Sequence, residues 1–570
     1  MRRVNDLHER LKATLVGILN STEEANWVLC GVEAEKLRML YRGKPRPLAL
    51  VSFDVDRIKD FVFSSVKLLE ISGASEMVKD LTCPPQNGVE APHCSVYRIL
   101  EDQHLSSDNV VFAGGGTGML VVPVDMAEIL AKEISDRFAG AVKTGSCTTI
   151  WRAFHPHELI LGPDIAAGDS FFPGVKLPVG ASGFGSVMRL MADELREKKE
   201  EKMVPAIFSL PGYVARCASC GIRPALKRDK LSWDDELLCE SCFTQRKRGR
   251  DTKTDLSGQL LEMAQSINDI LREDAERGYV GVIHADADQM GRKLMQMQTL
   301  DDMAIFSSTV TRVIEDIRVH LVSKHELSRQ YQAPIVGGDD ILLIVPAHKT
   351  PVIVADLLTA VRQDFTYWSS LLAPDKEKLS EIFKSITMSV GFVIVPSHYQ
   401  IRFSVDYAEN LLAQAKKGSH EGAGEHVDFA VISDGTPLHA EISTLRQQFY
   451  TRRSEKWCLS LTARPLKASR FRALLEKIEV LKSAMAKNQL KLLENLLFGE
   501  TPEAARINIL YQWVRMDSWW EDIFGRDHKK MEEWLKEFLL KEGDARNGIR
   551  SYNSAITELV ELYDFVEVGT

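Results

Sequence analysis

Short apolar runs that end in acidic residues or glycines predict the β-strands of this chain. One run starts at Tyr279 and ends at Asp286, and two others flank Gly337-Gly338-Asp339-Asp340. Runs rich in Ile, Val and Leu on both sides of two glycines are typical of a β-hairpin, with Gly337 and Gly338 as the turn. An amphipathic stretch over residues 301–329 lies between them and predicts a long helix. The order strand, helix, hairpin can place Asp286 beside the turn.

The pattern continues after the hairpin as one compact α/β unit. The predicted elements are a helix over 350–370, a strand over 385–395, a helix over 403–417 and a strand over 427–432. The helix over 403–417 ends in two lysines, which suit the C-terminal end of a helix dipole. The order β-α-β-β-α-β is that of a ferredoxin-like sheet.

A degenerate version of the same pattern lies earlier in the chain. A strand over 47–53 leads to Asp54 and Asp56, and a helix follows from Asp60. The hairpin of this copy turns on three glycines, Gly114, Gly115 and Gly116. Two copies of strand, helix and glycine hairpin predict an internal duplication. The first copy has no acidic pair after its glycines, so we expect metal at the second copy. The glycine turn of the first still leaves room for a nucleotide.

The carboxylates of the second copy are the candidate catalytic and metal-binding residues. Adjacent carboxylates on a rigid turn repel one another, and a divalent cation offsets that repulsion. Mg²⁺ or Mn²⁺ held by Asp286, Asp339 and Asp340 would suit nucleotidyl transfer, in which two ions about 4 Å apart activate a 3′-hydroxyl and stabilise leaving pyrophosphate. The alternative is an ordinary polar turn, since Gly and Asp are common turn residues. Asp288 is either part of the site or a surface turn residue.

Four clustered cysteines predict a structural zinc site. Cys217 and Cys220 form one C-x₂-C pair, Cys239 and Cys242 form a second, and 18 residues separate the pairs. This is the spacing of a zinc ribbon, and four thiolates leave no open coordination position. A redox dithiol is the alternative. The run Arg246–Arg250 that follows is either a phosphate-contacting loop or a solvated surface segment.

Composition limits the class of protein. With 570 residues, 45% hydrophobic and 26% charged, the chain is expected to form several globular domains. Its net charge of −9 argues against nucleic-acid binding over the whole surface. No apolar run is long enough to cross a membrane, and the N-terminus lacks the apolar core of a signal peptide. We therefore expect a cytoplasmic protein without membrane association, whose five other cysteines are thiols.

Together these motifs resemble the large subunit of type III CRISPR–Cas effector complexes, the CRISPR polymerase. The matching segments are Asp54–Phe63, Phe112–Gly116, Ala285–Gly291 and the Gly-Gly-Asp-Asp hairpin, in this order along the chain and with the cysteine pairs between the two copies. The resemblance implies an α+β fold with two ferredoxin-like palm domains of the nucleotidyl cyclase type. A zinc-ribbon-containing helical insert would separate them, and a helical domain would follow.

The expected domains follow from these boundaries. They are a short helical segment over 1–45, a degenerate first palm over 46–205, a zinc-ribbon and helical domain over 206–275, a catalytic second palm over 276–437 and a helical interaction domain over 438–570. The last contains an apolar-periodic stretch from Leu474 to Leu497. It also contains four tryptophans better suited to core or interface packing than to base stacking: Trp513, Trp519, Trp520 and Trp534.

The resemblance also implies an activity. Target RNA, paired to a CRISPR RNA held by other subunits, would switch on synthesis of cyclic oligoadenylates from ATP. Gly337 and Gly338 would allow close approach of the ribose and phosphates, and Lys416 resembles the phosphate-gripping lysine of palm-type cyclases, with helix capping as its alternative. The acceptor nucleotide would lie beside residues of the first palm, namely Asp54, Asp56, Gly114, Gly115 and Gly116.

One departure from the family leaves the product open. Many members begin with an HD nuclease, but none of the 14 histidines here is followed by Asp, so we expect no DNase activity. Some members without that domain join ATP to S-adenosylmethionine, which is therefore an alternative substrate. The motifs also fit a diguanylate cyclase, or a scaffold for CRISPR RNA without enzymatic activity.

Overall fold

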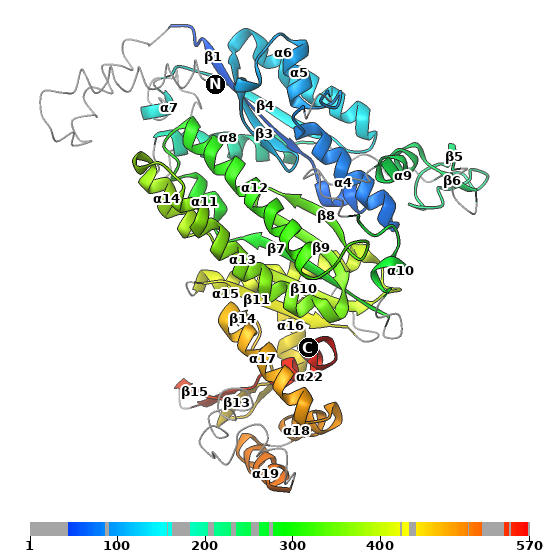
Figure 1. The fold of residues 1–570 in the computed structure, drawn as a ribbon, viewed down its shortest axis with the longest axis vertical. Coiled ribbons are helices and arrows are strands. Elements are labelled where there is room, and N and C mark those ends of the chain that lie inside the picture. Colours follow the sequence, from blue (N-terminus) through cyan, green and yellow to red (C-terminus); the bar gives the residue numbers. More distant parts are fainter. Residues whose placement is uncertain are drawn as a thin grey trace, which may run out of the picture.

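The structure is a computed structural model. It describes residues 44–85, 90–156, 158–161, 183–202, 210–229, 235–251, 262–272, 278–421, 424–432, 441–499, 501–515, 541–546 and 549–567. The segment expected over residues 1–45 therefore lies almost wholly outside the described residues. Figure 1 shows two α/β units one above the other, with a small cysteine-bearing unit beside the first and the C-terminal elements below the second.

The first α/β unit, the first palm, has a four-stranded sheet in the order β2-β3-β1-β4. Its strands are β1 (Leu48–Val55), β2 (Val110–Gly114), β3 (Thr117–Pro123) and β4 (Cys147–Phe154). Its helices are α3 (Ile58–Val62), α4 (Leu68–Thr82), α5 (Val96–Asp102), α6 (Val124–Val142), α7 (Glu158–Leu161) and α8 (Gly183–Glu200). Residues of β1 alternate between two cores: Val51 packs with α4 and α6, and Leu50 with α8.

The second palm repeats this order of strands. Its sheet runs β14-β11-β10-β7-β9-β8, so the four strands β10-β7-β9-β8 match the ferredoxin-like arrangement predicted from the sequence. The strands are β7 (Tyr279–Ala287), β8 (Gln332–Gly337), β9 (Asp340–Pro346), β10 (Met388–Pro396), β11 (His426–Val431) and β14 (Leu466–Lys467). The helices are α11 (Met290–Leu294), α12 (Leu300–Lys324), α13 (Thr350–Ser370), α14 (Glu377–Lys384) and α15 (Ile401–Glu421).

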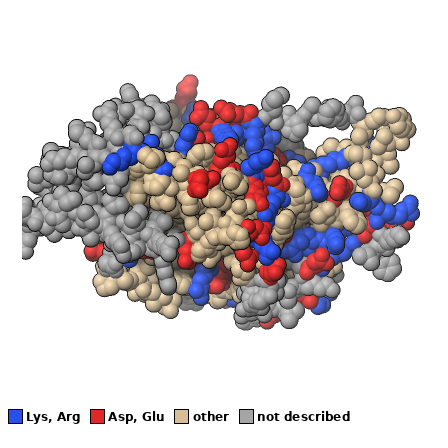
Figure 2. Space-filling view, turned by 90° about the horizontal axis from the view of Figure 1, so that it is seen from above, with Lys and Arg blue, Asp and Glu red and all other residues tan. Residues whose placement is uncertain are grey.

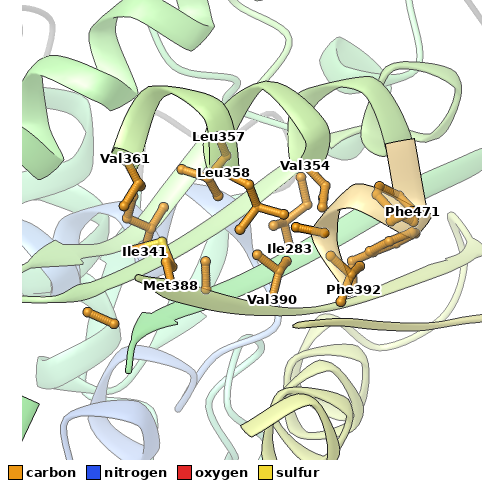
Figure 3. Packing of buried hydrophobic residues seen from close by; sticks show 14 of the residues in the cluster. Ile283, Ile341, Val354, Leu357, Leu358, Val361, Met388, Val390, Phe392 and Phe471 are labelled. Carbon is orange, nitrogen blue, oxygen red and sulfur yellow. The ribbon is translucent and has the colours of Figure 1, made fainter. Parts of the chain in front are cut away.

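Helices cover both faces of the second sheet. Figure 3 shows α13 side chains such as Val354 and Leu358 against Ile283 and Val390 of the strands. On the other face α15 lies so close to β10 that a Cβ on Gly391 would come within 2.3 Å of the Ala408 carbonyl oxygen. Glycine is needed there because any side chain would meet the α15 backbone.

The interface between the two palms is built from equivalent elements of both. Helix α12 of the second palm contacts β2 of the first, and helix α4 of the first palm contacts β8 of the second. Because α4 and α12 occupy equivalent places in the two copies, each palm packs its first long helix against the hairpin of the other. The two copies expected from the sequence therefore also contribute equivalent helices and strands to the interface between them.

The cysteine-bearing unit, here called the ribbon, comprises the described residues 210–229 and 235–251, with β5 (Lys227–Asp229), β6 (Glu236–Leu238) and α9 (Glu240–Asp251). Helices α4 and α9 cross at two glycines: a Cβ on Gly73 would lie 1.8 Å from the Gln245 carbonyl oxygen, and one on Gly249 would lie 2.0 Å from that of Leu69. The short helix α10 (Ile267–Ile270) precedes the second palm.

The C-terminal region corrects the expectation of helices alone. A four-stranded sheet runs β12-β13-β16-β15, with β12 (Thr451–Arg453), β13 (Trp457–Ser460), β15 (Lys541–Arg546) and β16 (Ile549–Asn553). The helices are α16 (Ile442–Phe449), α17 (Ala468–Ala484), α18 (Lys487–Gly499), α19 (Pro502–Arg515) and α22 (Ile556–Leu562). The apolar stretch expected over Leu474–Leu497 is therefore two helices. The side chain of Trp513 and all of Trp519, Trp520 and Trp534 lie outside the described residues.

None of the helices in the described parts of the chain combines the length and the apolar character needed to cross a bilayer. Seen from the first-palm end in Figure 2, acidic and basic side chains are interspersed. On this face the net negative charge does not gather into a single acidic surface.

Candidate active site

The Gly-Gly-Asp-Asp hairpin of the second palm brings three carboxylates together. The turn consists of Gly338 and Asp339, since β8 extends through Gly337 and β9 begins at Asp340, which corrects the expected turn at Gly337 and Gly338 by one residue. Gly338 has φ +59°, a left-handed conformation that favours glycine. Asp340 pairs with Asp286 of β7 in the antiparallel register. The strand–helix–hairpin order predicted from the sequence is confirmed.

Asp339 and Asp286 lie next to each other, half-buried, so that each carboxyl disfavours the charged form of the other. Burial and the neighbouring Asp286 raise the pKa of Asp339 to about 7, and the two carboxyls are hydrogen-bonded. Burial also raises the pKa of Asp286, although Lys416 opposes this rise. A carboxyl whose pKa is raised by burial and by a second carboxyl is a place where a cation can replace the proton.

Lys416 of α15 points into this cluster. Its Nζ is paired with the Asp286 carboxylate and lies 3.4 Å from the Ala287 carbonyl oxygen. The side chain therefore belongs to the site, beyond any effect on the end of its helix. An ammonium group beside two carboxylates also compensates part of their charge.

A histidine that the sequence did not single out holds the third carboxylate. Nε2 of His284 lies 2.8 Å from Oδ1 of Asp340, and the imidazole is buried. Among the described residues its Nδ1 has no hydrogen-bond partner. The available signal was a single polar residue inside the apolar run that leads to Asp286.

Asp288 is a buried structural residue and not a surface turn residue. Its two carboxylate oxygens accept hydrogen bonds from Thr387 and Ser389 at 2.8 and 2.7 Å, and Lys293 donates to its carbonyl oxygen at 2.8 Å. These bonds tie the start of α11 to β10. Asp288 thus fixes the loop that follows Asp286.

The first palm has an equivalent of the Asp286–Lys416 pair. Lys199 of α8 donates to Asp54 at 2.6 Å and to the Val55 carbonyl oxygen at 3.2 Å, as Lys416 contacts Asp286 and the Ala287 carbonyl. Burial raises the pKa of Asp54, and Lys199 opposes it. The duplication therefore extends to a carboxylate–ammonium pair that the sequence alone did not align.

Asp56 is the first-palm equivalent of Asp288. It accepts hydrogen bonds at 2.6 Å from both Ser146 and Thr148 of the loop and strand at β4. Burial alone would raise the pKa of Asp56, but the bonds from Lys202, Ser146 and Thr148 outweigh it and hold the pKa below its ordinary value. Asp56 is thus engaged in holding its own loop.

The two glycine hairpins meet tip to tip between the palms. A Cβ on Gly337 would come within 2.8 Å of the Gly115 Cα. Beside this contact lies a cavity of about 580 Å³. It is lined from both palms, by residues that include Asp54, Gly114, Gly115, Lys199, Gly337, Gly338, Asp339 and Asp340. Gly116 instead faces Val55 and Val78, and Asp56 lines a different pocket.

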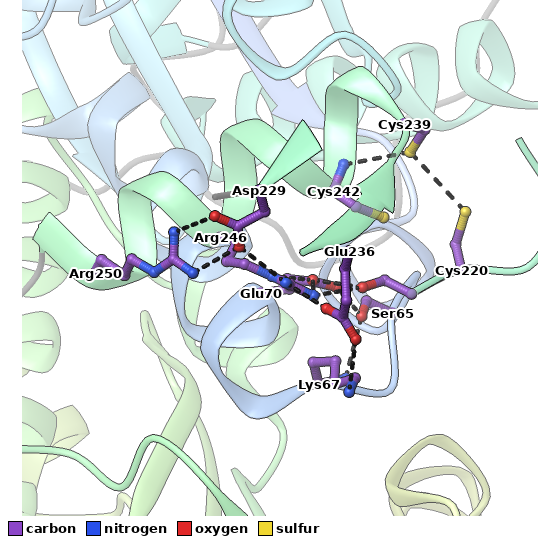
Figure 4. Close-up of polar contacts among 11 residues, drawn as sticks. Ser65, Lys67, Glu70, Cys220, Asp229, Glu236, Cys239, Cys242, Arg246 and Arg250 are labelled. Atoms are coloured by element: carbon purple, nitrogen blue, oxygen red, sulfur yellow. Dashed lines mark hydrogen bonds and ion pairs between the residues drawn. The ribbon is translucent and has the colours of Figure 1, made fainter. Parts of the chain in front are cut away.

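The four ribbon cysteines fit a zinc ion. Their Sγ atoms all lie within 4.8 Å of one another, and the Cys220 and Cys239 sulfurs are 4.0 Å apart (Figure 4). Tetrahedral zinc places thiolate sulfurs about 3.8 Å apart, so little movement is needed. Within the described residues this is the only group that brings three or more potential ligand atoms so close. The carboxylates of the second palm are more loosely arranged, since Lys416 and His284 each hold one.

The run Arg246–Arg250 is neither a phosphate-contacting loop nor a solvated segment. It lies on α9, and Arg246 is buried, with ion pairs to Glu70 of α4 and to Asp229 and Glu236 of the ribbon strands (Figure 4). Arg250 also pairs with Asp229 at 2.6 Å. Arg246 thus attaches the ribbon to the first palm through Glu70, whereas the pair of Arg250 with Asp229 joins α9 to β5 within the ribbon.

The second palm matches a known family. Residues 279–423 match the family model described as Cas10/Cmr2, second palm domain. This segment contains the carboxylate hairpin, His284 and Lys416. The family expected from the sequence motifs is therefore confirmed for the second palm.

One solved structure extends the likeness in fold to most of the chain. A crystal structure of Csm1 in T. onnurineus is 14% identical with a TM-score of 0.51, and the alignment covers 93% of this chain and 71% of that one. A Csm1–Csm4 cassette in complex with cA4 is also 14% identical, with a TM-score of 0.49 and coverage of 91% and 70%. At this identity the likeness to Csm1 concerns the fold. No curated protein matches the chain.

Proposed function

We propose that this chain is the large subunit of a type III CRISPR RNA-guided effector complex and makes cyclic oligoadenylate from ATP by metal-dependent nucleotidyl transfer. The observation that carries the proposal is the cavity between the palms. There the carboxylate hairpin of one copy faces the Asp54–Lys199 pair of the other. Two nucleotides must meet for a phosphodiester bond to form, and a cavity lined by both copies suits that requirement.

In this proposal Asp286, Asp339 and Asp340 hold Mg²⁺ or Mn²⁺, which would activate the attacking 3′-hydroxyl and stabilise the leaving pyrophosphate. Asp339 would hold the cation in its ionised form, and Lys416, beside Asp286, would supply a positive charge for the phosphates of the donor nucleotide. Gly337 and Gly338 leave room for the ribose and phosphates at the turn.

The acceptor nucleotide belongs to the first palm in the same proposal. Asp54 and Lys199 flank its position, and Gly114 and Gly115 form the floor beside the opposing hairpin. The first palm has Thr117 where the second has Asp340, since Gly114 pairs with Thr117 as Gly337 pairs with Asp340. We therefore assign catalysis to the second palm alone.

The proposed partners follow from the family. Csm1 has been solved with Csm4, as the Csm1–Csm4 subcomplex of the type III-A CRISPR–Csm interference complex. By analogy, other effector subunits would hold this chain against CRISPR RNA and target RNA in the cytoplasm, and target binding would switch on synthesis.

Two products other than cyclic oligoadenylate are alternatives that experiment can distinguish. A conjugate of ATP with S-adenosylmethionine would use the same carboxylates, and a diguanylate cyclase would take GTP. A scaffold without activity is the non-enzymatic alternative, and the retained carboxylate cluster argues against it.

The first test is removal of the hairpin carboxylates. The double variant Asp339→Asn, Asp340→Asn in the reconstituted RNA-bound complex should lose at least about 100-fold in product formation, because the charge that holds the cation is gone. Asp316→Asn, on the exposed side of α12, is the control and should leave synthesis unchanged. Normal synthesis by an assembled double variant would refute the assignment.

A further inference from the structure

A second pocket lies where the first palm meets the ribbon. It has a volume of about 360 Å³, within the range of roughly 300–1,000 Å³ typical of ligand sites. The first palm contributes the loop after β1, the loop before β4 and the end of α8, and the ribbon contributes a single residue, Arg223. The cationic lining residues are Arg57, Lys199, Lys202 and Arg223, and the acidic ones are Asp56 and Asp60.

The acidic residues of this pocket are already engaged. Asp56 is held by Lys202 and two hydroxyl groups, and Asp60 pairs with Arg402 of α15 at 2.8 Å. Across the described residues no ion pair involves Arg57 or Arg223. The charge left over in the pocket is therefore positive, which favours an anion.

Arg223 presents an unsatisfied donor. Its Nη1 atom is buried and has no hydrogen-bond partner within the described parts of the chain. A buried guanidinium nitrogen without an acceptor is costly, and a phosphate oxygen in the pocket would supply that acceptor. Lys199, at the edge of both pockets, links this place to the cavity between the palms.

The cysteine loop holds Arg223 in place. The Cys217 amide donates to the Arg223 carbonyl oxygen at 2.9 Å, and the amides of Ile222 and Arg223 donate to the Cys220 sulfur. Since Cys217 and Cys220 are two of the four potential zinc ligands, a bound zinc ion would fix the backbone that carries Arg223.

We propose that the ribbon contributes Arg223 to a polyphosphate-binding site of the first palm, and that metal bound by the four cysteines keeps this arginine in position. The ligand is the polyphosphate group of a nucleotide substrate, and in this respect the inference rests on the proposed function. The ribbon is then more than a structural appendage: loss of its metal weakens nucleotide binding at the first palm.

Inorganic tripolyphosphate without added Mg²⁺ is the probe, because the carboxylate cluster of the second palm repels it under these conditions. Calorimetry on the full chain should give at least about tenfold weaker binding for Arg223→Ala, the loss of one charge-assisted contact. Arg228→Ala is the matched control, since Arg228 is exposed on the same ribbon and pairs with Asp235. Unchanged affinity in Arg223→Ala, or a loss confined to Lys416→Ala, would overturn the proposal.

Removal of the metal provides a second test, which measures tripolyphosphate binding by the zinc-free protein. Chelator-treated wild-type protein, with zinc loss verified by elemental analysis and the melting of the palms checked by calorimetry, should bind tripolyphosphate as weakly as Arg223→Ala. The same treatment should not weaken the variant further. Full affinity in the stripped wild-type protein would contradict the coupling. The Asp339→Asn, Asp340→Asn variant should keep tripolyphosphate binding, which separates this inference from the proposed catalysis.

Discussion

The protonation of Asp339 connects the hairpin geometry to cation binding. Its pKa of about 7 means that the carboxyl holds a proton through the acidic range, since burial and Asp286 disfavour the charged form. A cation must displace that proton, so affinity rises with pH until the carboxyl is ionised without help.

The prediction is a pH-dependent affinity for Mn²⁺. Below about pH 7 the affinity should rise up to roughly tenfold per pH unit, for one released proton, and it should level off above. Titration calorimetry between pH 5.5 and 8.5 measures this slope. Asp339→Asn should bind more weakly and lose the part of the slope due to that proton, whereas equal slopes in both proteins would assign the proton to another group.

At the same scale, the sequence predicted the carboxylates but few of their partners. Asp286, Asp339 and Asp340 stand out because acidic residues at the ends of apolar runs are unusual. His284 and Lys199 do not, because a lone histidine in a strand or a lysine in a charged helix is ordinary. Only the fold shows that they meet Asp340 and Asp54.

Among the elements, the crossing of α4 and α9 sets how the ribbon joins the first palm. Because Gly73 and Gly249 have no side chain, the backbones of α4 and α9 come so close that a Cβ on either residue would meet the other helix. The ion pairs of Arg246 then lie at the side of this contact. The position of Arg223 in its pocket depends on this junction.

Gly249→Ala should therefore loosen the ribbon. The added methyl would meet the Leu69 carbonyl oxygen, and overpacking of this kind costs typically about 1–3 kcal/mol. Gly140→Ala on α6 is the control: nothing lies within 4 Å of its Cβ, so it should be neutral or stabilising by up to about 1 kcal/mol. Thermal unfolding and limited proteolysis of the ribbon measure both, and equal melting temperatures for the two variants would show that the contact adapts.

The elements also show where sequence patterns fail. Both palms follow from strong runs bounded by glycine and aspartate. The C-terminal sheet does not, because β12 and β13 are only three and four residues long. The sheet also joins two local antiparallel pairs, β12–β13 and β15–β16, through the parallel pairing of β13 with β16, which lies far along the chain and leaves no local signal. The apolar periodicity through Leu474–Leu497 continued across the break between α17 and α18.

At the scale of the whole molecule, duplication with divergence is the main organising feature. Two copies retain the Asp–Lys pair and the glycine hairpin, and reciprocal helix contacts bring the hairpins together. Only the second copy has acidic residues at the turn. One copy is thus equipped to hold a cation, and the other supplies the opposite wall of the cavity.

The most direct test is the product itself. The reconstituted RNA-bound complex is incubated with ATP and Mg²⁺ or Mn²⁺, with and without S-adenosylmethionine and with GTP in parallel, and the products are identified by mass spectrometry. We predict adenylate rings from ATP alone, formed only with the divalent ion and absent in the Asp339→Asn, Asp340→Asn variant. A product only with GTP, a product only with S-adenosylmethionine, or equal synthesis without a divalent ion would contradict this prediction.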